Sequence, residues 1–553
     1  MRPAALPSLV LLAAVCVTSA QAAPAAEPML DFVVVRSDTL IGLSNNVLVS
    51  PSAWREVARL NRLPDPNRIT PGQRLKIPTR LLRSRAVDAT LVSVVGDVRS
   101  GDAPAVLGAT LAEGQSVQTG AGSSAVIALA DGSRMRLPPS SLAQVAASRS
   151  YGDRGAASAD ASTTGSGWFA GTLRVLRGGV EVFATKVLRA KPLEVVTPTA
   201  VVGVRGTQYR VTLDEGANGR THAEVLEGAV RFDAAAGAAG AAGTDLPTGF
   251  GAAIDATTNV PASTRLLGAP DLAALPDRFE RPLVRFELPG ETAPLRVQVA
   301  ADSGFDRIVS DERVAAGTPV RIAGLEDAQW YLRARRVDAQ GIEGFDATRA
   351  FVLKARPEPP AYRTPRANGK QTVGGVEFAW AQNVEAPKVQ LQVAEDAAFT
   401  RIVQARDDLA DAALRADLAT PGTYFWRLAS IRASGDHGPF GDPQRFELRP
   451  LPEPPSAGRS ADGNSLIFKW GGRAEDRQQV QLARDPAFTQ IVSQDELGAT
   501  EWVLPLPSRG GRYYFRYRSV EPDGFVSPYS TTAMIDLPRD WTGLLLLLPL
   551  LLL

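Results

Sequence analysis

Three copies of one residue pattern in the C-terminal half of the chain limit its fold more than any other feature. The pattern is aliphatic-Gln-aliphatic-Ala-x-Asp-x-x-Phe-x-x-Ile-Val, and it occupies residues 297–309, 391–403 and 480–492. A second pattern, aromatic-x-Arg-x-x-x-aliphatic, recurs at the same offsets of 94 and 89 residues, around Arg333, Arg427 and Arg516. Because two independent patterns keep one register, the sequence predicts three related domains of about 90 residues each.

Short stretches of these repeats alternate apolar and polar residues, for example residues 295–299 and 331–335, and Gly or Asp turns separate them. This alternation is typical of half-buried strands, and a domain of such strands without cysteine favours an antiparallel β-sandwich. The phenylalanine of the first pattern follows an Asp turn in every copy. We therefore expect three buried rings, at Phe305, Phe399 and Phe488.

The repeats resemble fibronectin type III modules in their architecture and in a few aromatic residues. Trp380 and Trp470 lie on expected strands at 376–380 and 466–470, and Phe286 takes this place in the first repeat. The resemblance implies that these side chains fill the core between two sheets. The repeats are assigned to residues 270–356, 357–450 and 451–538.

Two proline-rich stretches, residues 355–360 and 451–455, precede the second and third repeats and have nearly the same sequence. Such stretches favour the extended polyproline conformation, which acts as a stiff spacer. The sequence therefore predicts sandwiches that fold separately. The residues that the repeats share are most simply core and turn residues.

Residues 31–78 form a different and smaller unit. A strand that begins at Phe32 runs to an Asp-Thr turn at 38–39, which can cap a helix, and a second helix covers residues 54–61. A Pro-Gly turn at 71–72 leads into a closing strand. The order is therefore strand, helix, helix, strand.

This unit, assigned to residues 31–80, closely resembles the LysM module, and the closing block at 69–78 matches the family pattern at nearly every position. Ser37 stands where the family has glycine. The resemblance implies binding of N-acetylglucosamine-containing glycan, chiefly peptidoglycan, in a shallow groove between two loops. The residues that it places in this groove are Asp38, Thr39, Leu40, Leu63, Asn67, Ile69 and Thr70. Asp38 and Thr39 would also cap the helix in the absence of sugar.

Residues 88–235 contain many short β segments, including expected strands at 172–176 and 180–184 with two glycines between them. The stretch Thr-Pro-Thr-Ala-Val-Val-Gly-Val-Arg-Gly-Thr-Gln-Tyr at 197–209, with a strand-turn-strand at 225–230, resembles the signature of the FecR domain. The resemblance implies a β-rich sensory or docking domain.

Within this signature we single out Gly203, Arg205, Gly206 and Thr207. Glycines on both sides of Arg205 favour a tight backbone turn in which the guanidinium bonds local carbonyls or a buried acid. A ligand role for Arg205 is the alternative. The best-known relatives pass a signal through a transmembrane helix to a cytoplasmic segment that grips a sigma factor. Because an export signal is expected before this domain instead, that role is not carried over.

Two stretches without apolar periodicity, at 148–167 and 234–243, indicate flexible loops. The second is an Ala-Gly tract that lacks the flanking strand and helix of a dinucleotide fingerprint. Residues 236–269 are therefore assigned as a linker between the FecR-like domain and the first repeat.

Both ends of the chain carry apolar segments. Residues 1–22 combine Arg2, an apolar run and Ala-Gln-Ala, which is typical of a cleaved export signal. Residues 541–553 form a leucine-rich tail that is too short to span a bilayer alone. Contact of Leu544–Leu553 with a membrane and docking of the tail on the preceding domain both stay open. We expect an exported protein of the periplasm or cell envelope.

Composition excludes several functions. The chain has two histidines and a single cysteine, Cys16, which lies in the expected export signal, so we expect no Cys/His zinc site, no thiol chemistry and no disulfide framework. The formal net charge of +1 gives no field that would collect nucleic acid. No catalytic motif lies on a suitable element. The prediction is therefore no metal, no cofactor and no catalytic residue.

The predicted fold class is a mainly β, multidomain protein with a small βααβ LysM module, a β-rich FecR domain and three antiparallel β-sandwich repeats. We expect a non-enzymatic envelope protein that binds peptidoglycan through LysM and presents its other domains to a partner protein or signal that the sequence does not identify. Two alternatives stay open: a sensory or regulatory envelope component that acts through the FecR domain, and a cell-wall hydrolase.

Overall fold

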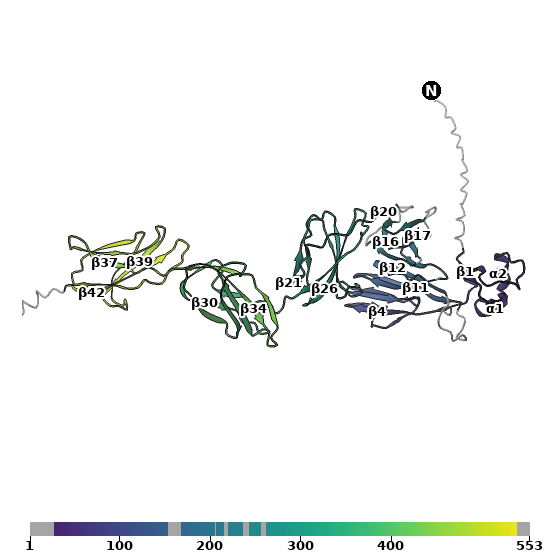
Figure 1. Cartoon of the computed structure of the whole chain (residues 1–553), viewed down its shortest axis with the longest axis horizontal. Helices are drawn as coiled ribbons and strands as arrows, with labels where there is room; N and C mark the ends of the chain where they lie inside the picture. Colours follow the sequence, from purple (N-terminus) through teal and green to yellow (C-terminus); the bar gives the residue numbers. More distant parts are fainter. Residues whose placement is uncertain are drawn as a thin grey trace, which may run out of the picture. The chain divides into compact units, whose positions relative to one another are not determined.

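The computed structural model divides the chain into two compact units, Met1–Leu353 and Lys354–Leu553. It describes residues 27–152, 168–187, 189–204, 206–214, 219–235, 243–255 and 262–538. The expected export signal, the leucine-rich tail and Arg205 lie outside these ranges. Figure 1 labels the elements along the chain.

The LysM-like module has the predicted order of elements. Strand β1 (Met29–Val33) pairs antiparallel with β2 (Arg74–Pro78), and helices α1 (Leu40–Asn46) and α2 (Trp54–Leu60) connect them. Asn61 lies just after α2 and joins the helix to the sheet. Its side-chain Nδ2 donates to the carbonyl oxygens of Val57 and Lys76, each at 2.8 Å. Its Oδ1 accepts from the backbone amide of Lys76 at 2.7 Å. Asn61 therefore fixes the packing of α2 on β2.

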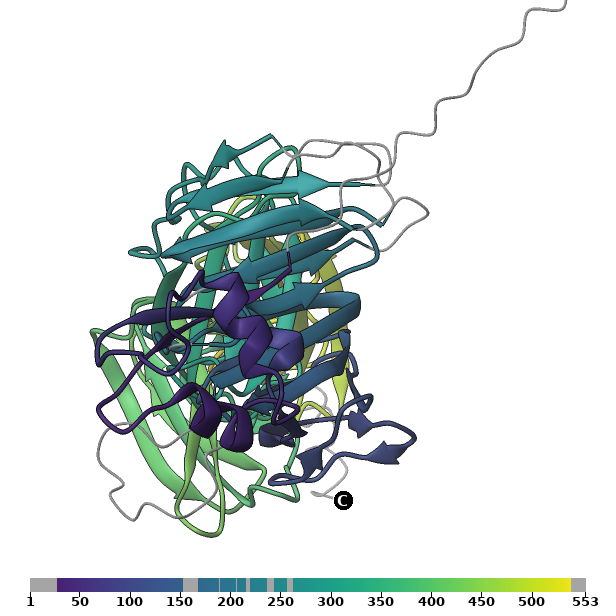
Figure 2. The same cartoon turned by 90° about the vertical axis from the view of Figure 1, so that its right-hand side faces the viewer.

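The module, whose helices are drawn in purple in Figure 2, shares aromatic contacts with the FecR-like region. The ring of Phe32 on β1 meets the indole of Trp168 edge to face, with 5.5 Å between centroids, and Tyr151 packs against the same core. The short helix η1 (Thr79–Leu81) follows β2 and leads to strand β3 (Ser84–Ala86), the first strand of the FecR-like region. There β3 pairs with residues 149–151. The LysM core is therefore completed by side chains from its neighbour.

Strands β3–β20 form the FecR-like region, which consists of two sheets that share strand β12 (Trp168–Phe183). The first sheet also contains β3, β5 (Val98–Ser100), β6 (Ala103–Pro104), β8 (Ser116–Thr119), β11 (Leu142–Tyr151), β13 (Leu193–Val196), β14 (Ala200–Val204), β17 (Ala229–Ala234) and β18 (Thr244–Pro247). The second also contains β4 (Ala89–Val95), β7 (Thr110–Leu111), β9 (Ser124–Ala128), β10 (Arg134–Leu137), β15 (Gln208–Leu213), β16 (Thr221–Glu227), β19 (Phe250–Ile254) and β20 (Thr264–Arg265). Buried side chains from both sheets form one apolar core.

The expectation of two strands at 172–176 and 180–184 is wrong, because β12 is continuous through both. Residues 168–177 pair with β11 and residues 178–183 pair with β15, so β12 passes from one sheet to the other. Gly178 lies at this point with φ +70°, and a Cβ there would come within 2.5 Å of the Ser141 hydroxyl. The glycine therefore permits a change of sheet rather than a turn between strands.

The assignment of residues 236–269 as a linker is also wrong over much of its length. Strand β18 pairs with β17, β19 pairs with β16, and β20 pairs with β19, so this segment extends both sheets. Its alternating residues Leu246, Ala252 and Ile254 are buried in the shared core. The Ala-Gly tract at 236–242 lies outside the described residues.

Each repeat contains two sheets, in which the strands pair antiparallel as predicted except for the parallel pairs β21–β27 and β29–β36. The first repeat has β21 (Arg278–Phe279), β22 (Val284–Phe286), β23 (Leu295–Ala300), β24 (Ile308–Val314), β25 (Val320–Ile322), β26 (Ala328–Arg336) and β27 (Ala347–Leu353). The second has β28 (Tyr362–Thr364), β29 (Gly369–Thr372), β30 (Gly374–Trp380), β31 (Lys388–Ala394), β32 (Ile402–Leu409), β33 (Ala413–Leu418), β34 (Gly422–Ile431), β35 (His437–Phe440) and β36 (Gln444–Arg449). The third has β37 (Ser456–Arg459), β38 (Ser465–Lys469), β39 (Arg477–Ala483), β40 (Ile491–Leu497), β41 (Glu501–Pro505), β42 (Gly511–Val520) and β43 (Ala533–Leu537). Trp380, Trp470 and Phe286 are buried as expected.

The two sequence patterns of the repeats meet in space. The ring of Phe399 is 6 % exposed, and the guanidinium of Arg427 lies over it at 4.0 Å from the centroid while donating from Nε and Nη2 to Oε1 of Gln392. The same three residue types interact in the other repeats, where the phenylalanines are 3 % and 7 % exposed. The prediction that all three rings are buried is confirmed.

These phenylalanines also adopt a left-handed backbone, with φ of 58°, 57° and 55° at Phe305, Phe399 and Phe488. A non-glycine residue in this region costs about 1–2 kcal/mol. The repeats tolerate this cost at the same position because the conformation turns the ring under the arginine.

We predict that Phe399→Ala destabilises the second repeat by about 3–5 kcal/mol, because it removes a buried ring without relieving the backbone. Phe399→Gly should recover about 1 kcal/mol of that loss, since glycine adopts a positive φ freely. Denaturant unfolding of the full chain, with hydrogen exchange read on peptides from β31 and β34, measures both. If Phe399→Ala lowered the free energy of unfolding by less than about 1 kcal/mol, the claim that the buried ring stabilises the repeat would be contradicted.

Candidate functional site

The two loops that the LysM resemblance assigns to glycan binding lie side by side. The first joins β1 to α1 and the second joins α2 to β2. Backbone bonds connect them: the amide of Val34 donates to the carbonyl of Gln73 at 2.9 Å, and the amide of Gly72 donates to the carbonyl of Val34 at 2.8 Å. Gly72 has φ +87°, which favours glycine at this turn.

In the first loop Thr39 caps α1, whereas Asp38 closes the turn that precedes the helix. Oδ2 of Asp38 accepts from the Val35 amide at 2.8 Å, and Oγ1 of Thr39 accepts from the Gly42 amide at 2.9 Å, which caps α1. Thr39 is exposed and Asp38 is half-buried.

The LysM resemblance places Leu40 in the glycan groove, but the structure buries this side chain. Leu40 is 2 % exposed, because it begins α1 on the face that packs into the module core. In the second loop Leu63 and Ile69 are half-buried against that core, whereas Asn67 and Thr70 are exposed. Ile69 and Leu63 are therefore the apolar groups of this surface that a ligand could contact.

The FecR signature residues in the described part of the chain have backbone roles. Gly203 lies in β14, and Gly206 has φ +65°. A Cβ on Gly206 would come within 2.5 Å of Lys186 Cγ, and one on Gly228 within 2.4 Å of Thr207 Cγ2. The signature therefore packs two turns closely against each other. Arg205 lies outside the described residues, so its role stays a prediction.

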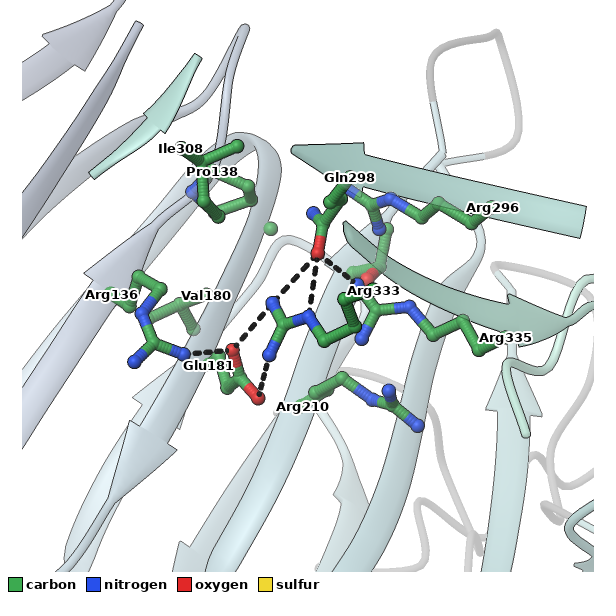
Figure 3. Close-up of a pocket in the computed structure, with 12 residues that line it drawn as sticks. Arg136, Pro138, Val180, Glu181, Arg210, Arg296, Gln298, Ile308, Arg333 and Arg335 are labelled. Carbon is green, nitrogen blue, oxygen red and sulfur yellow. Dashed lines mark hydrogen bonds and ion pairs between the residues drawn. The ribbon is translucent and has the colours of Figure 1, made fainter. Parts of the chain in front are cut away.

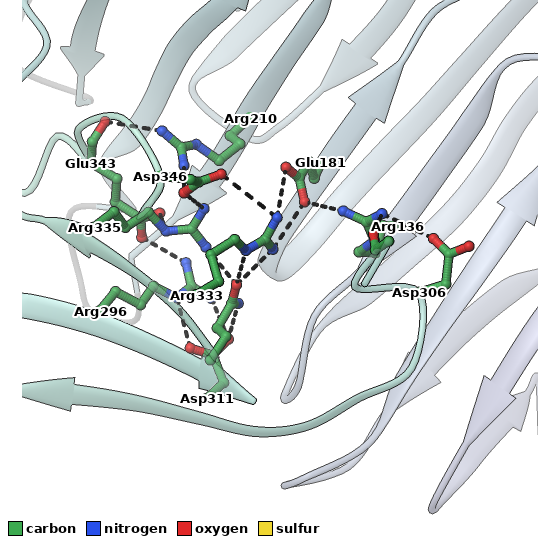
Figure 4. A network of polar contacts seen from close by, with 12 residues as sticks. Arg136, Glu181, Arg210, Arg296, Asp306, Asp311, Arg333, Arg335, Glu343 and Asp346 are labelled. Atoms are coloured by element: carbon green, nitrogen blue, oxygen red, sulfur yellow. Dashed lines mark hydrogen bonds and ion pairs between the residues drawn. The ribbon is translucent and has the colours of Figure 1, made fainter. Parts of the chain in front are cut away.

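A second site, which sequence reasoning missed, is a buried ionic cluster between the FecR-like region and the first repeat (Figure 4). We call it the junction cluster. Four neighbouring strands of the second FecR-like sheet each contribute one charged residue: Arg136, Glu181, Arg210 and Glu224. The first repeat contributes Arg296, Asp306, Asp311, Arg333, Arg335, Glu343 and Asp346.

Glu181 lies at the centre of the junction cluster. Its carboxylate accepts from Nη1 of Arg136 at 2.5 Å and from both terminal nitrogens of Arg333 at 3.2 and 3.3 Å. Arg333 is also the arginine of the repeat pattern, so one guanidinium binds Phe305, Gln298 and the neighbouring domain together. Around it, Arg296 bonds Glu343 at 2.6 Å, and Asp346 accepts from both Arg210 and Arg335 at 3.1 Å.

A cavity of about 20 Å³ lies among these side chains and is lined by Arg136, Glu181, Arg210, Gln298, Arg333 and Arg335, among others (Figure 3). A space of this size holds about one water molecule. The junction cluster is therefore a structural contact between domains, and its cavity is too small for a sugar ring.

The electrostatics of the cluster differ from one acid to the next. Burial alone would raise the pKa of Glu181, but the positive charges of Arg333 and Arg136 outweigh it and hold that pKa well below its usual range. The pKa of Glu343 is lowered in the same way, mainly by Arg296 and Arg335. Burial raises the pKa of Glu224 to about 7, because Arg210 compensates it only in part and Glu343 lies close.

A sequence signal for the cluster exists, although it is weak. Glu181, Arg210 and Glu224 each stand between two buried apolar residues of a strand. Charged residues at the same phase of adjacent strands indicate a polar outer sheet face. Only the fold shows that a second domain covers that face.

Comparisons with known proteins agree with the two N-terminal resemblances. The family model for the LysM domain matches residues 32–78, and the family model for FecR protein matches residues 115–231. No curated protein is similar enough to match. The chain therefore carries a LysM domain and a FecR domain.

Similar solved structures include a candidate anti-sigma factor from Parabacteroides distasonis, at 15 % identity and a TM-score of 0.20, covering 27 % of this chain and 59 % of that one. They also include the FN1–FN3 domains of chicken CNTN1, at 12 % identity and a TM-score of 0.20, where the match covers 50 % of this chain and 97 % of that one. A third is a structure of fibronectin(III)-like modules of Clostridium thermocellum CbhA, at 12 % identity and a TM-score of 0.20, where the match covers 32 % of this chain and 93 % of that one. These scores are too low to carry an argument about function.

LysM and FecR are non-catalytic domain families, typical of envelope-associated proteins, and LysM indicates glycan binding. Among the described residues, no helix has both the length and the apolar character needed to cross a membrane.

We predict that Glu181→Gln destabilises the unit Met1–Leu353 by about 3–5 kcal/mol at pH 7, because it removes the carboxylate that the buried guanidiniums of Arg136 and Arg333 share. Among the described residues, Arg136 then keeps only Asp306 as an acidic partner, and Arg333 keeps only the longer 3.7 Å contact with Asp346. The stabilisation by Glu181 is present above its unfolded pKa, near 4.5, and is lost as the pH falls below it. Urea unfolding at pH 7 and pH 3.5 measures this, and the difference between variant and wild type should shrink at the lower pH. If the variant and wild type differed in stability by the same amount at pH 7 and at pH 3.5, the assignment of a lowered pKa to Glu181 would be contradicted.

Glu224→Gln should show the opposite pH dependence. A carboxyl whose pKa rises to about 7 on folding favours the folded state at low pH, and this contribution is lost as the pH rises through 7. Relative to wild type, the variant should therefore gain stability between pH 5 and pH 8. Urea midpoints of the variant and wild type, measured from pH 5 to pH 8, test this. If the difference between the two midpoints stayed constant over that range, Glu224 would not titrate there.

Proposed function

We propose that this protein is a non-enzymatic cell-envelope protein that binds peptidoglycan through its LysM domain and presents the FecR domain and the repeats to a partner. The observation that supports this most directly is the match of residues 32–78 to LysM together with the adjacent loops that the family uses for glycan. Exposed Thr39, Asn67 and Thr70 offer hydrogen bonds to an acetamido group, and half-buried Leu63 and Ile69 offer apolar contact.

We further propose that the FecR domain and the first repeat act as one unit. The face of β10, β12, β15 and β16 is bonded to the first repeat through the junction cluster. Hydroxyls of Ser93 and Ser124 add bonds to the carbonyls of Asp306 and Ile308 at 3.1 and 3.0 Å. A partner protein would therefore bind surfaces other than this face.

A sensory or regulatory role through the FecR domain is a second candidate, favoured by the match of residues 115–231. It differs from simple tethering in requiring a protein partner that the FecR domain recognises. Crosslinking of the mature protein in intact envelopes, followed by identification of the captured proteins, tests it.

The hydrolase alternative finds less support. In the described part of the chain, the junction cluster brings together Glu181, Glu343, Asp311 and Asp346, and all four are ion-paired to arginines. A glycosidase needs two carboxyl groups that flank a bound sugar, with one available as an acid. A cavity of about 20 Å³ does not admit that substrate.

The glycan proposal predicts that the double variant Asn67→Ala/Thr70→Ala co-sediments less with insoluble peptidoglycan than wild type does, with an apparent affinity about tenfold lower. Both side chains are exposed, so the fold should not change. Deleting the whole module is a poorer test, because Trp168 and Tyr151 would lose their packing partners.

Asn45→Ala is the matched control, since Asn45 is an exposed asparagine on α1 outside the two loops. It should sediment like wild type. Equal sedimentation of all three proteins would place the contact with peptidoglycan elsewhere.

A further inference from the structure

A pocket of about 360 Å³ lies where the end of β36 in the second repeat leads into the third repeat. This volume lies within the range of about 300–1,000 Å³ that is usual for small-molecule sites. Its lining includes the apolar residues Leu451, Pro452 and Phe525 and the charged residues Arg449, Arg473, Asp476 and Glu521.

Asp476 is the unusual member of this lining. Its side chain belongs to a residue that is 5 % exposed, and its Oδ1 atom has no hydrogen-bond partner. A buried acceptor without a partner costs stability. Burial and the nearby Glu521 raise the pKa of this carboxyl, because both disfavour its negative charge.

The second repeat shows that the fold does not require an acid at this position. The turn before β39 closes with a bond from the Asp476 amide to the carbonyl of Arg473 at 3.1 Å, and the turn before β31 closes with a bond from the Ala386 amide to the carbonyl of Asn383 at 3.3 Å. Ala386 is fully buried. The same structural position therefore holds alanine in one repeat and an unpaired acid in the next.

Two arginines supply positive charge to the same pocket. Nη2 of Arg449 bonds Oε2 of Glu521 at 2.9 Å, and Arg473 lies 3.6 Å from the same oxygen. Nε of Arg449 is buried and has no partner. The pocket thus combines an unused buried acceptor with an unused buried donor beside an apolar wall.

We propose that this pocket binds a small zwitterion, a free amino acid or the end of a short peptide, with its ammonium group on Asp476 and its carboxylate on Arg449 and Arg473. Such a ligand satisfies both unpartnered atoms at once, which a simple cation or anion does not. Its side chain would lie against Leu451 and Phe525. This site is independent of the glycan surface of the LysM domain.

Isothermal titration of the mature full-length protein with alanine and with dialanine tests the proposal and separates the two ligand sources. N-Acetylalanine lacks the ammonium charge and alaninamide lacks the carboxylate, so each should bind at least about tenfold more weakly than the zwitterion that binds best. Failure of both alanine and dialanine to bind at concentrations on the order of 10 mM would overturn the proposal, as would equal binding of the blocked compounds.

Asp476→Ala reproduces the residue of the second repeat, so it should fold, and it should abolish binding while raising the denaturant midpoint of the free protein. Asp536→Asn removes an exposed acid of the same repeat outside the pocket lining and serves as the matched control. Binding that survives Asp476→Ala, or a lower midpoint for that variant, would overturn the assignment of Asp476 as a ligand-binding residue.

Discussion

The contact of Glu181 with Arg136 and Arg333 is the interaction on which the organisation of the N-terminal unit depends. It joins two strand systems that are separate in sequence and places a carboxylate between two guanidiniums in a nearly dry interface. Buried charges are costly unless they are paired, so this contact specifies one arrangement of the two domains and penalises others. The FecR domain and the first repeat are thereby fixed to each other rather than joined by a free hinge.

The three repeats show how one structural motif is adapted to this role. Each repeat places an arginine over a phenylalanine and bonds it to a glutamine. In the second and third repeats a further aromatic ring, Phe440 or Tyr529, covers the other side of the guanidinium. In the first repeat Asp346 stands near the arginine instead, and the guanidinium is turned into a contact with the FecR domain. A core element has thus become an interface element through a change from aromatic to acidic neighbours.

The LysM domain is connected to its neighbour by apolar packing rather than by charge. Trp168 and Tyr151 complete its core, which leaves the loops around Thr39 and Thr70 on the exposed side of the module. A glycan-binding surface that is anchored in this way transmits its position to the FecR domain directly.

The sequence by itself determined the domain types, the three-repeat register and the burial of Phe305, Phe399 and Phe488, because these follow from local periodicity and from residues that recur at fixed spacing. It failed at Leu40, at the continuous strand β12 and at the segment 236–269, where burial and pairing depend on partners distant in the chain. The junction cluster and the unpaired Asp476 were likewise decided only by tertiary structure. A charged residue in a strand has the same local pattern whether it faces water or another domain, and only the packing of the two domains removes the water.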